Sequence, residues 1–278
     1  MLREGTLSEI SDGRLYGLND MVRADCAGCA GCSKCCRSNM GTSISLDPYD
    51  VWMLSRGTGR SFEDMVEKEI KISMLDGLAL PHMNMEHGCQ FLDGEGRCSI
   101  HPYRPSICRL FPLGRYYENG DFRYFLQVHE CTKANRSKVK VQKWIDIDCI
   151  EEHTAFVRKW HNFLGLARRK VSEASDPQQI RNFMLFLLDL FYVVGYDTEA
   201  EPLGGEAVPT GEAEPLGGEA VPTGEAEPQG EEAVPTGEAE SMRDGSPEAG
   251  QSGDAEAFFR QFHKRMQTAV REMKRILR

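Results

Sequence analysis

Helix starts are marked along the chain by the spacing of apolar residues and by the polar residues that precede them. Asp47 precedes Pro48, which puts an N-cap residue before a proline at the first helical position. Ser61 is followed three residues later by Asp64, in the form of a capping box. Asp176-Pro177 opens a third helix that continues through the apolar segment 183–194, and residues 139–170 are also mainly helical in pattern.

Two short hairpins are predicted between these helices. Residues 115–118 and 121–124 flank Asn119-Gly120, a strong type I′ turn signal. Residues 89–92 and 97–100 form the second hairpin, in which Leu92 would pair with Arg97. Alternation along those strands then puts Cys89, Phe91, Cys98 and Ile100 on one face, with Cys89 and Cys98 close enough to share one metal centre. The fold class expected is α+β, mainly helical, with two short hairpins around a cysteine-ligated metal centre.

Composition divides the chain into three regions. Residues 1–198 are mixed and globular, and residues 199–253 are rich in Gly, Pro and Glu. The second region contains three copies of a 13-residue unit at 201–239, which read EPLGGEAVPTGEA twice and then EPQGEEAVPTGEA. Such a sequence has no aromatic residues and cannot bury enough apolar surface to fold. We predict a disordered acidic linker there, followed by an amphipathic helix at 254–278.

The last region carries one apolar stripe on a helix. Its apolar residues recur at steps of three and four: Phe259, Phe262, Met266, Ala269, Met273 and Ile276. Basic residues decorate the rest of the helix: Arg260, Lys264, Arg265, Arg271, Lys274, Arg275 and Arg278. Such a helix docks on its own chain, binds a protein partner or lies on a membrane surface. Docking or a protein partner is favoured here over a membrane.

The net charge of −10 is a property of the linker. Residues 201–253 carry −12 and residues 254–278 carry +4, which leaves −2 for residues 1–200. A nucleic-acid-binding domain is normally basic, so nucleic acid is not an expected partner. No apolar stretch is long enough to span a bilayer, and the N-terminus lacks the apolar core of a secretory signal. We therefore expect no transmembrane segment and a cytoplasmic location.

Ten cysteines in such a chain point to metal, because cytoplasmic thiols stay reduced and structural disulfides are rare there. The densest run comprises Cys26, Cys29, Cys32, Cys35 and Cys36. Its repeated two-residue gaps let successive thiolates converge on one centre, as in zinc sites and iron–sulfur sites. Thiolates select zinc, copper(I) or iron–sulfur clusters over hard cations. The spacing predicts a metal site and leaves iron and zinc both open.

Further cysteines follow at Cys89, Cys98, Cys108, Cys131 and Cys149. Thiolates gathered in one place repel one another unless cations neutralise them. Arg104 and Arg109 flank Cys108 and are predicted to lie beside the cofactor, where they supply positive charge and hydrogen bonds to sulfur. The alternative for each arginine is an ordinary surface ion pair.

Two blocks of this sequence resemble a known family. The run Cys29-x2-Cys32-x2-Cys35-Cys36 matches the CxxCxxCC signature of the YkgJ-type cysteine-cluster proteins, which are described as zinc- or iron-chelating. The second block reads C-x-F-L from Cys89, G-x-C-x-I-H around Cys98 and R-P-x-x-C-R-x-F-P around Cys108, and it follows the same family's pattern. The helix start at Leu46-Asp47 is similar as well. The resemblance covers residues 26–135.

This resemblance implies the metal ligands residue by residue. They are Cys29, Cys32, Cys35, Cys36, Cys89, Cys98 and Cys108, with Cys131 as an eighth. Eight thiolates suffice for two sites of four ligands, so one site and two sites both stay open. Cys26 lies outside the signature and allows a second N-terminal register, Cys26-Cys29-Cys32. Cys149 is interpreted as a small buried hydrophobic residue in a helix.

Three functions remain in competition. The first is a metal-binding protein that holds an iron–sulfur cluster, such as 4Fe–4S, or iron or zinc ions, with a redox or metal-handling role. The second is a zinc-stabilised interaction module whose C-terminal helix binds a protein partner. The third is an enzyme, since flagellin lysine methylases carry a similar cysteine cluster. The chain shows neither a Gly-rich nucleotide loop nor a nucleophile elbow, so catalysis stays undecided and no catalytic residue is assigned.

Overall fold

The computed structural model describes residues 6–25, 32–41, 43–66, 68–131, 133, 136–196 and 250–277. Within these ranges, helices combine with small antiparallel sheets, as the α+β prediction requires. The predicted linker lies outside the described residues as far as residue 249. From Gly250 onward the chain belongs to the C-terminal helix.

The helices begin where the local sequence signals predict them. Asp47, Ser61 and Asp176 occupy the N-cap positions of α2, α3 and α7, and each side chain accepts a hydrogen bond from a backbone N–H of the first turn. The α-helices are α1 (Leu7–Ile10), α2 (Pro48–Thr58), α3 (Phe62–Met65), α4 (Ser106–Leu110), α5 (Val141–Ile145), α6 (Ile150–Glu173), α7 (Pro177–Leu188) and α8 (Gly250–Ile276). A 3₁₀ turn, η2 (His101–Tyr103), and two π-helical turns, η1 (Cys35–Asn39) and η3 (Asp189–Val193), accompany them.

The strands pair in three small antiparallel sheets within the described ranges, in the orders β1-β7, β2-β4-β3 and β5-β6. They are β1 (Met21–Asp25), β2 (Ser43–Ser45), β3 (Ile70–Leu75), β4 (Leu78–Asn84), β5 (Leu113–Glu118), β6 (Asp121–Leu126) and β7 (Ser137–Lys140). The hairpin predicted around Asn119-Gly120 is confirmed as β5 and β6, with Glu118 opposite Asp121. The β3–β4 hairpin is an addition to the prediction, although Asp76-Gly77 at its turn is the same kind of signal.

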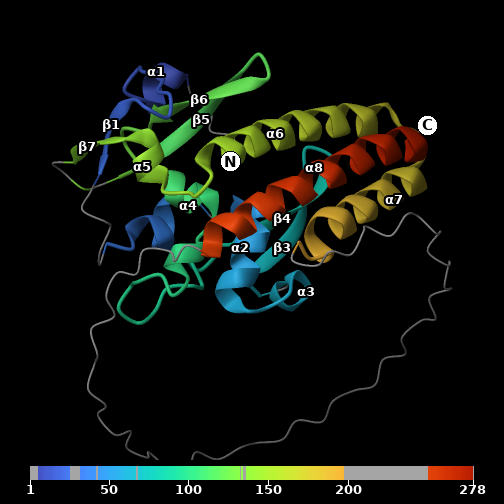
Figure 1. The fold of residues 1–278 in the computed structure, drawn as a ribbon, viewed down its shortest axis with the longest axis horizontal. Helices are drawn as coiled ribbons and strands as arrows, with labels where there is room; N and C mark the ends of the chain where they lie inside the picture. Colours follow the sequence, from blue (N-terminus) through green and yellow to red (C-terminus); the bar gives the residue numbers. More distant parts are fainter. Residues whose placement is uncertain are drawn as a thin grey trace, which may run out of the picture.

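Three helices lie side by side at one side of the molecule, where α8 packs against both α6 and α7 (Figure 1). Aromatic rings join this layer to α2. The ring centroids of Tyr49 and Phe258 are 5.3 Å apart, and those of Phe156 and Phe262 are 4.5 Å apart. The C-terminal helix therefore completes the core of the protein. Of the alternatives left open for it, docking on its own chain is the one that the structure shows.

The buried stripe of α8 is rotated slightly from the predicted one. It consists of Ala255, Phe258, Phe262, Arg265, Ala269 and Met273. The predicted stripe residues Phe259, Met266 and Ile276 are only partly buried, at its margins. The prediction that Arg265 lies on the polar face is wrong, because its side chain is 2% exposed. Among the helices of the described ranges, none is long and apolar enough to cross a membrane.

Arg265 is buried because it closes the end of the preceding helix. Its guanidinium donates hydrogen bonds to the carbonyl oxygens of Leu190 (2.8 Å), Val194 (2.7 Å) and Gly195 (2.6 Å), and lies 3.8 Å from the ring centroid of Tyr196. Carbonyl groups at a helix C-terminus have no partner within the helix, and a basic side chain is a favourable donor to them. Arg265 thus fastens α8 to the end of η3.

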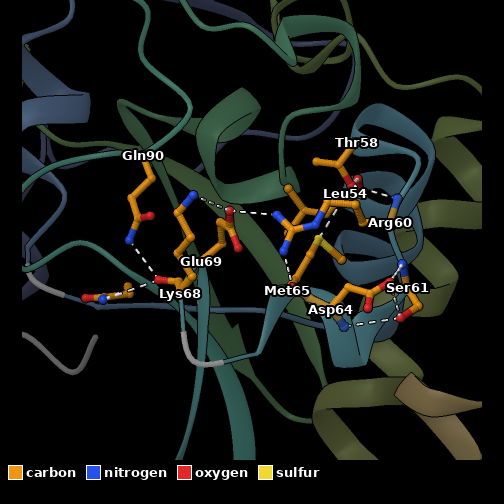
Figure 2. A network of polar contacts seen from close by, with 10 residues as sticks. Leu54, Thr58, Arg60, Ser61, Asp64, Met65, Lys68, Glu69 and Gln90 are labelled. Atoms are coloured by element: carbon orange, nitrogen blue, oxygen red, sulfur yellow. Dashed lines mark hydrogen bonds and ion pairs between the residues drawn. The ribbon is translucent and has the colours of Figure 1, made fainter.

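A polar network fixes the loop that carries Cys89 to the three-stranded sheet (Figure 2). The side chain of Gln90 donates a hydrogen bond of 2.7 Å to the carbonyl oxygen of Lys68. The neighbouring Glu69 is buried and pairs with Arg60 at 2.7 Å, and Arg60 also donates to the carbonyl oxygen of Asp64. Because Lys68 and Glu69 lead directly into β3, this network sets where the Cys89 loop lies relative to the sheet.

Candidate metal centre

The N-terminal cysteine run enters the described structure at Cys32 and continues into η1. Such π-helical turns are frequent at functional sites. The Sγ atoms of Cys35 and Cys36 are 3.8 Å apart, and both side chains are partly buried. Cys29 and the ambiguous Cys26 lie outside the described residues, so their roles stay predictions.

The two cysteine blocks are in direct backbone contact. The N–H of Cys89 donates a hydrogen bond of 2.8 Å to the carbonyl oxygen of Cys36. Gly96, with a φ of 76°, faces the same turn, since a Cβ atom added there would lie 3.0 Å from Ser33 Oγ. Residues 88–98 therefore pack closely on the chain around η1, although more than fifty residues separate the two blocks in sequence.

The hairpin predicted from Cys89 to Ile100 is wrong in its register and in its extent. The segment forms a single bridge that pairs Leu92 with Cys98, where Leu92 was expected opposite Arg97. The cause is Asp93, whose Oδ1 accepts hydrogen bonds from the N–H groups of Glu95 (2.9 Å) and Arg97 (2.8 Å). This winds the chain into a turn one residue longer than predicted. The argument from strand alternation for one cysteine face therefore fails.

The third cysteine-bearing segment is α4, which carries Cys108. This short helix follows Pro105, and its Cys108 N–H donates to the Pro105 carbonyl oxygen at 2.9 Å. Burial raises the pKa of the Cys108 thiol, and the charges of Cys89, Asp50, Cys98 and Cys35 raise it further.

The pKa values of the Cys35 and Cys89 thiols are both raised by burial and by other thiols. The pKa of the Cys35 thiol is raised by its hydrogen bond with Cys36, by burial and by the charge of Cys36. Burial raises the pKa of the Cys89 thiol, with smaller contributions from the charges of Cys98 and Cys35. The four thiols Cys35, Cys89, Cys98 and Cys108 come from three separate segments. Within this set, beyond the larger effect of burial, the charges of Cys35 and Cys98 raise the pKa values of both Cys89 and Cys108, and the charge of Cys89 also raises that of Cys108.

Backbone N–H groups face two of these sulfur atoms. Burial raises the pKa of Cys89, but a hydrogen bond from the Phe91 N–H lowers it. Burial likewise raises the pKa of Cys98, and the Ile100 N–H lowers it. In both cases the donor lies two residues after the cysteine. Hydrogen bonds of this kind stabilise the thiolate form that metals require.

The two arginines have different surroundings. The positive charge of Arg104 lowers the pKa of Cys98, which burial raises, so Arg104 lies near that thiol. Arg109 is buried and donates to the carbonyl oxygens of Pro102, Asp146 and Arg104. The hydrogen bonds of Arg109 within the described structure therefore connect η2 to the end of α5, which orients the helix that carries Cys108.

Three further predicted ligands fall within the described residues. Cys32, Cys36 and Cys131 are partly exposed, and Cys131 is in the segment between β6 and β7. Among the described residues, no group of three or more Cys, His, Asp or Glu side chains is placed to hold a metal ion. The fit to a metal rests on chemistry: η1, the Cys89 loop and α4 each carry thiols, and thiolates are the ligands that thiophilic metals prefer.

Cys149 and Asp50 complete the account of the site. Cys149 precedes α6 in the left-handed conformation and packs partly buried against the core. Asp50, in the first turn of α2, is buried and accepts a hydrogen bond of 2.7 Å from the Ser106 N–H at the start of α4. The contact joins residues on different helices, so no local sequence signal could have revealed it.

Comparison with known proteins gives a family match and supports metal binding in general. Neither the curated proteins nor the solved structures contain a match to the chain. Residues 28–149 match the family described as "CxxCxxCC: Putative zinc- or iron-chelating domain". The matched segment spans the cysteines of η1, the Cys89 loop and α4, and it ends at Cys149. Residues 28–149 of this chain are therefore similar to a family described as zinc- or iron-chelating, which supports metal binding by this segment.

Proposed function

We propose that this domain holds an iron–sulfur cluster on cysteine thiolates and serves in electron transfer or redox sensing in the cytoplasm. The observation that carries the proposal is the hydrogen bond of 2.8 Å from the Cys89 N–H to the Cys36 carbonyl oxygen, which brings the two cysteine blocks together. With Cys108 of α4, these blocks carry the four thiols Cys35, Cys89, Cys98 and Cys108. Four thiolates are the ligand set of both 2Fe–2S and 4Fe–4S clusters. A bound cluster would supply one-electron chemistry, which the side chains of the domain cannot perform alone.

The surroundings of these thiols favour the thiolate form that a cluster requires. N–H groups directed at Cys89 and Cys98, together with the nearby Arg104, lower the free energy of negative charge on sulfur. The reduction potential of an iron–sulfur cluster depends on such hydrogen bonds and on solvent exposure. In this assignment Arg104 acts beside the cluster, and Arg109 acts by holding the backbone around α4.

A second group of ligands is proposed from the remaining cysteines: Cys29, Cys32, Cys36 and Cys131. The pairing of Asp25 with Ser137 supports it. In the sequence, the N-terminal cysteine run directly follows Asp25, and Cys131 precedes Ser137 by six residues. The two segments therefore leave the β1–β7 sheet from the same end.

Anaerobic purification followed by iron, zinc and acid-labile sulfide determination tests the proposal. We expect a brown protein with visible charge-transfer absorption and matching amounts of iron and sulfide. A colourless protein with stoichiometric zinc would contradict the redox function but would agree with metal binding by the cysteine thiolates. A protein without zinc, iron or sulfide under these conditions would contradict the metal site itself.

A further inference from the structure

Asp50 connects two helices through one carboxylate. Its Oδ1 accepts a hydrogen bond of 2.7 Å from the Ser106 N–H of α4, and its Oδ2 accepts one of 3.3 Å from the Asp47 N–H at the start of its own helix, α2. The side chain is 3% exposed. A buried carboxylate that accepts hydrogen bonds from backbone N–H groups at the starts of two helices fixes the position of one helix relative to the other.

The helix that carries Cys108 depends on this contact. With only five residues, α4 is too short to be stable alone. Pro105, at its N-cap, has no side-chain group that accepts a hydrogen bond from the first turn. Asp50 supplies that acceptor from a different helix, as an Asp at the N-cap would within one helix.

A second buried contact fixes the same point. The Ser106 hydroxyl lies 3.0 Å from Nε2 of His153 on α6, and both side chains are buried. Burial and the charges of Arg115 and Arg109 hold the pKa of His153 well below its ordinary value, so its ring is neutral. Ser106 is thus held between α2 and α6, two residues before Cys108.

From these contacts we propose that Asp50 is a positioning residue for the metal centre: its carboxylate caps α4 from α2 and thereby places the Cys108 thiol among the other three ligands. The inference rests on the proposed thiolate site and deepens it. It predicts that loss of the Asp50 carboxylate removes one thiolate from the centre although no cysteine is changed. The nearby charge of Asp50, which raises the pKa of Cys108, agrees with this proximity.

Cobalt(II) titration of the reduced full-length protein, freed of metal and kept anaerobic, measures this directly. The sulfur-to-cobalt charge-transfer absorption increases with the number of thiolates bound to each ion. We expect D50A to lose absorption equal to that lost in C108S, and to bind Co²⁺ about 10- to 100-fold more weakly than the wild type. The double variant D50A/C108S should lose no more than C108S alone, since the two changes remove the same ligand.

Two variants separate positioning from general stability. D50N keeps an oxygen acceptor for the Ser106 N–H, so it should bind cobalt with as many thiolates per ion as the wild type. D47A removes the cap of α2 itself, which costs about 1 kcal/mol of stability, and should keep the full count. The role of Asp50 would be overturned if D50A bound cobalt with as many thiolates as the wild type, or if D47A lost as many thiolates as D50A. Neither result would contradict the metal site itself. A wild-type protein that binds no cobalt through thiolates would overturn the metal site and this role together.

Discussion

The backbone N–H of Cys89 donates a hydrogen bond of 2.8 Å to the carbonyl oxygen of Cys36, and so joins the two cysteine blocks without involving a side chain. Because backbone groups make this contact, it survives replacement of either thiol. Single cysteine variants should therefore keep the two blocks together and report on ligation alone.

Replacing Cys108 with serine should lower metal retention by at least about tenfold, since a hydroxyl is a poor ligand for thiophilic metals. Metal per protein after anaerobic purification and gel filtration is the measurement. C149S is the matched control, because Cys149 is also partly buried in the same domain but is not a proposed ligand. Equal metal loss in both variants would argue against the ligand assignment.

Replacing Arg265 with methionine should lower the free energy of unfolding by about 3 kcal/mol, because buried carbonyl groups at the end of η3 lose a charged donor. Urea denaturation followed by tryptophan fluorescence measures the change. R260M alters an exposed residue of the same helix and should stay within about 0.5 kcal/mol of the wild type. If R265M is as stable as R260M, Arg265 does not hold α8 in place.

Two helical glycines should respond in opposite directions to alanine. A Cβ atom at Gly57 would lie 2.7 Å from Cβ of Tyr103, so G57A must push α2 away from η2 and should cost about 1–3 kcal/mol. Gly165 in α6 has no atom closer than 3.9 Å to such a Cβ, so G165A should stabilise the protein by about 0.5–1 kcal/mol. Thermal unfolding of both variants tests the pair, and stabilisation by G57A would be the contrary result.

His153 should make the protein less stable in mild acid. Burial, and then the charges of Arg115 and Arg109, keep its pKa well below 6.5 in the folded state. As the pH falls below about 6.5, the unfolded chain binds a proton that the folded chain does not, so this contribution is full above that pH and is lost below it. The loss amounts to at most about 1.4 kcal/mol per pH unit.

The variant H153Q keeps a donor for the Ser106 hydroxyl and removes the titration. The free energy of unfolding between pH 7 and 5.5 should therefore fall less steeply in H153Q than in the wild type. The buried Asp47 and Asp50, whose pKa values burial raises, act in the opposite direction but are common to both proteins. Identical slopes would show that His153 takes up its proton in the folded state as well.

Local signals predicted local structure well. The caps at Asp47, Ser61 and Asp176 and the Asn119-Gly120 turn depend on a few adjacent residues, and the structure confirms each of them. The β3–β4 hairpin could have been found from Asp76-Gly77 by the same reasoning. The β1–β7 pairing could not, because it joins segments more than one hundred residues apart whose partner choice depends on the whole fold.

Two predictions, for Arg265 and for the Cys89 hairpin, were wrong because tertiary or side-chain contacts override the local sequence pattern. Arg265 lies on the core side of α8 because the end of η3 supplies three carbonyl acceptors, which a helical projection cannot reveal. The Cys89 loop departs from hairpin form because one side chain, that of Asp93, winds its turn. Cysteine spacing indicated the chemistry of the site, whereas the convergence of Cys35 with Cys108 required the fold.

The capping of α4 by Asp50 has a consequence for the order of folding. A five-residue helix does not persist before its partners arrive, so α4 forms only after α2 has folded and long-range contact is made. A nascent chain therefore exposes its N-terminal cysteine run long before Cys108 reaches its place. Metal that arrived early would meet only local thiolates, and the proposed centre would be complete only once Cys108 is in place.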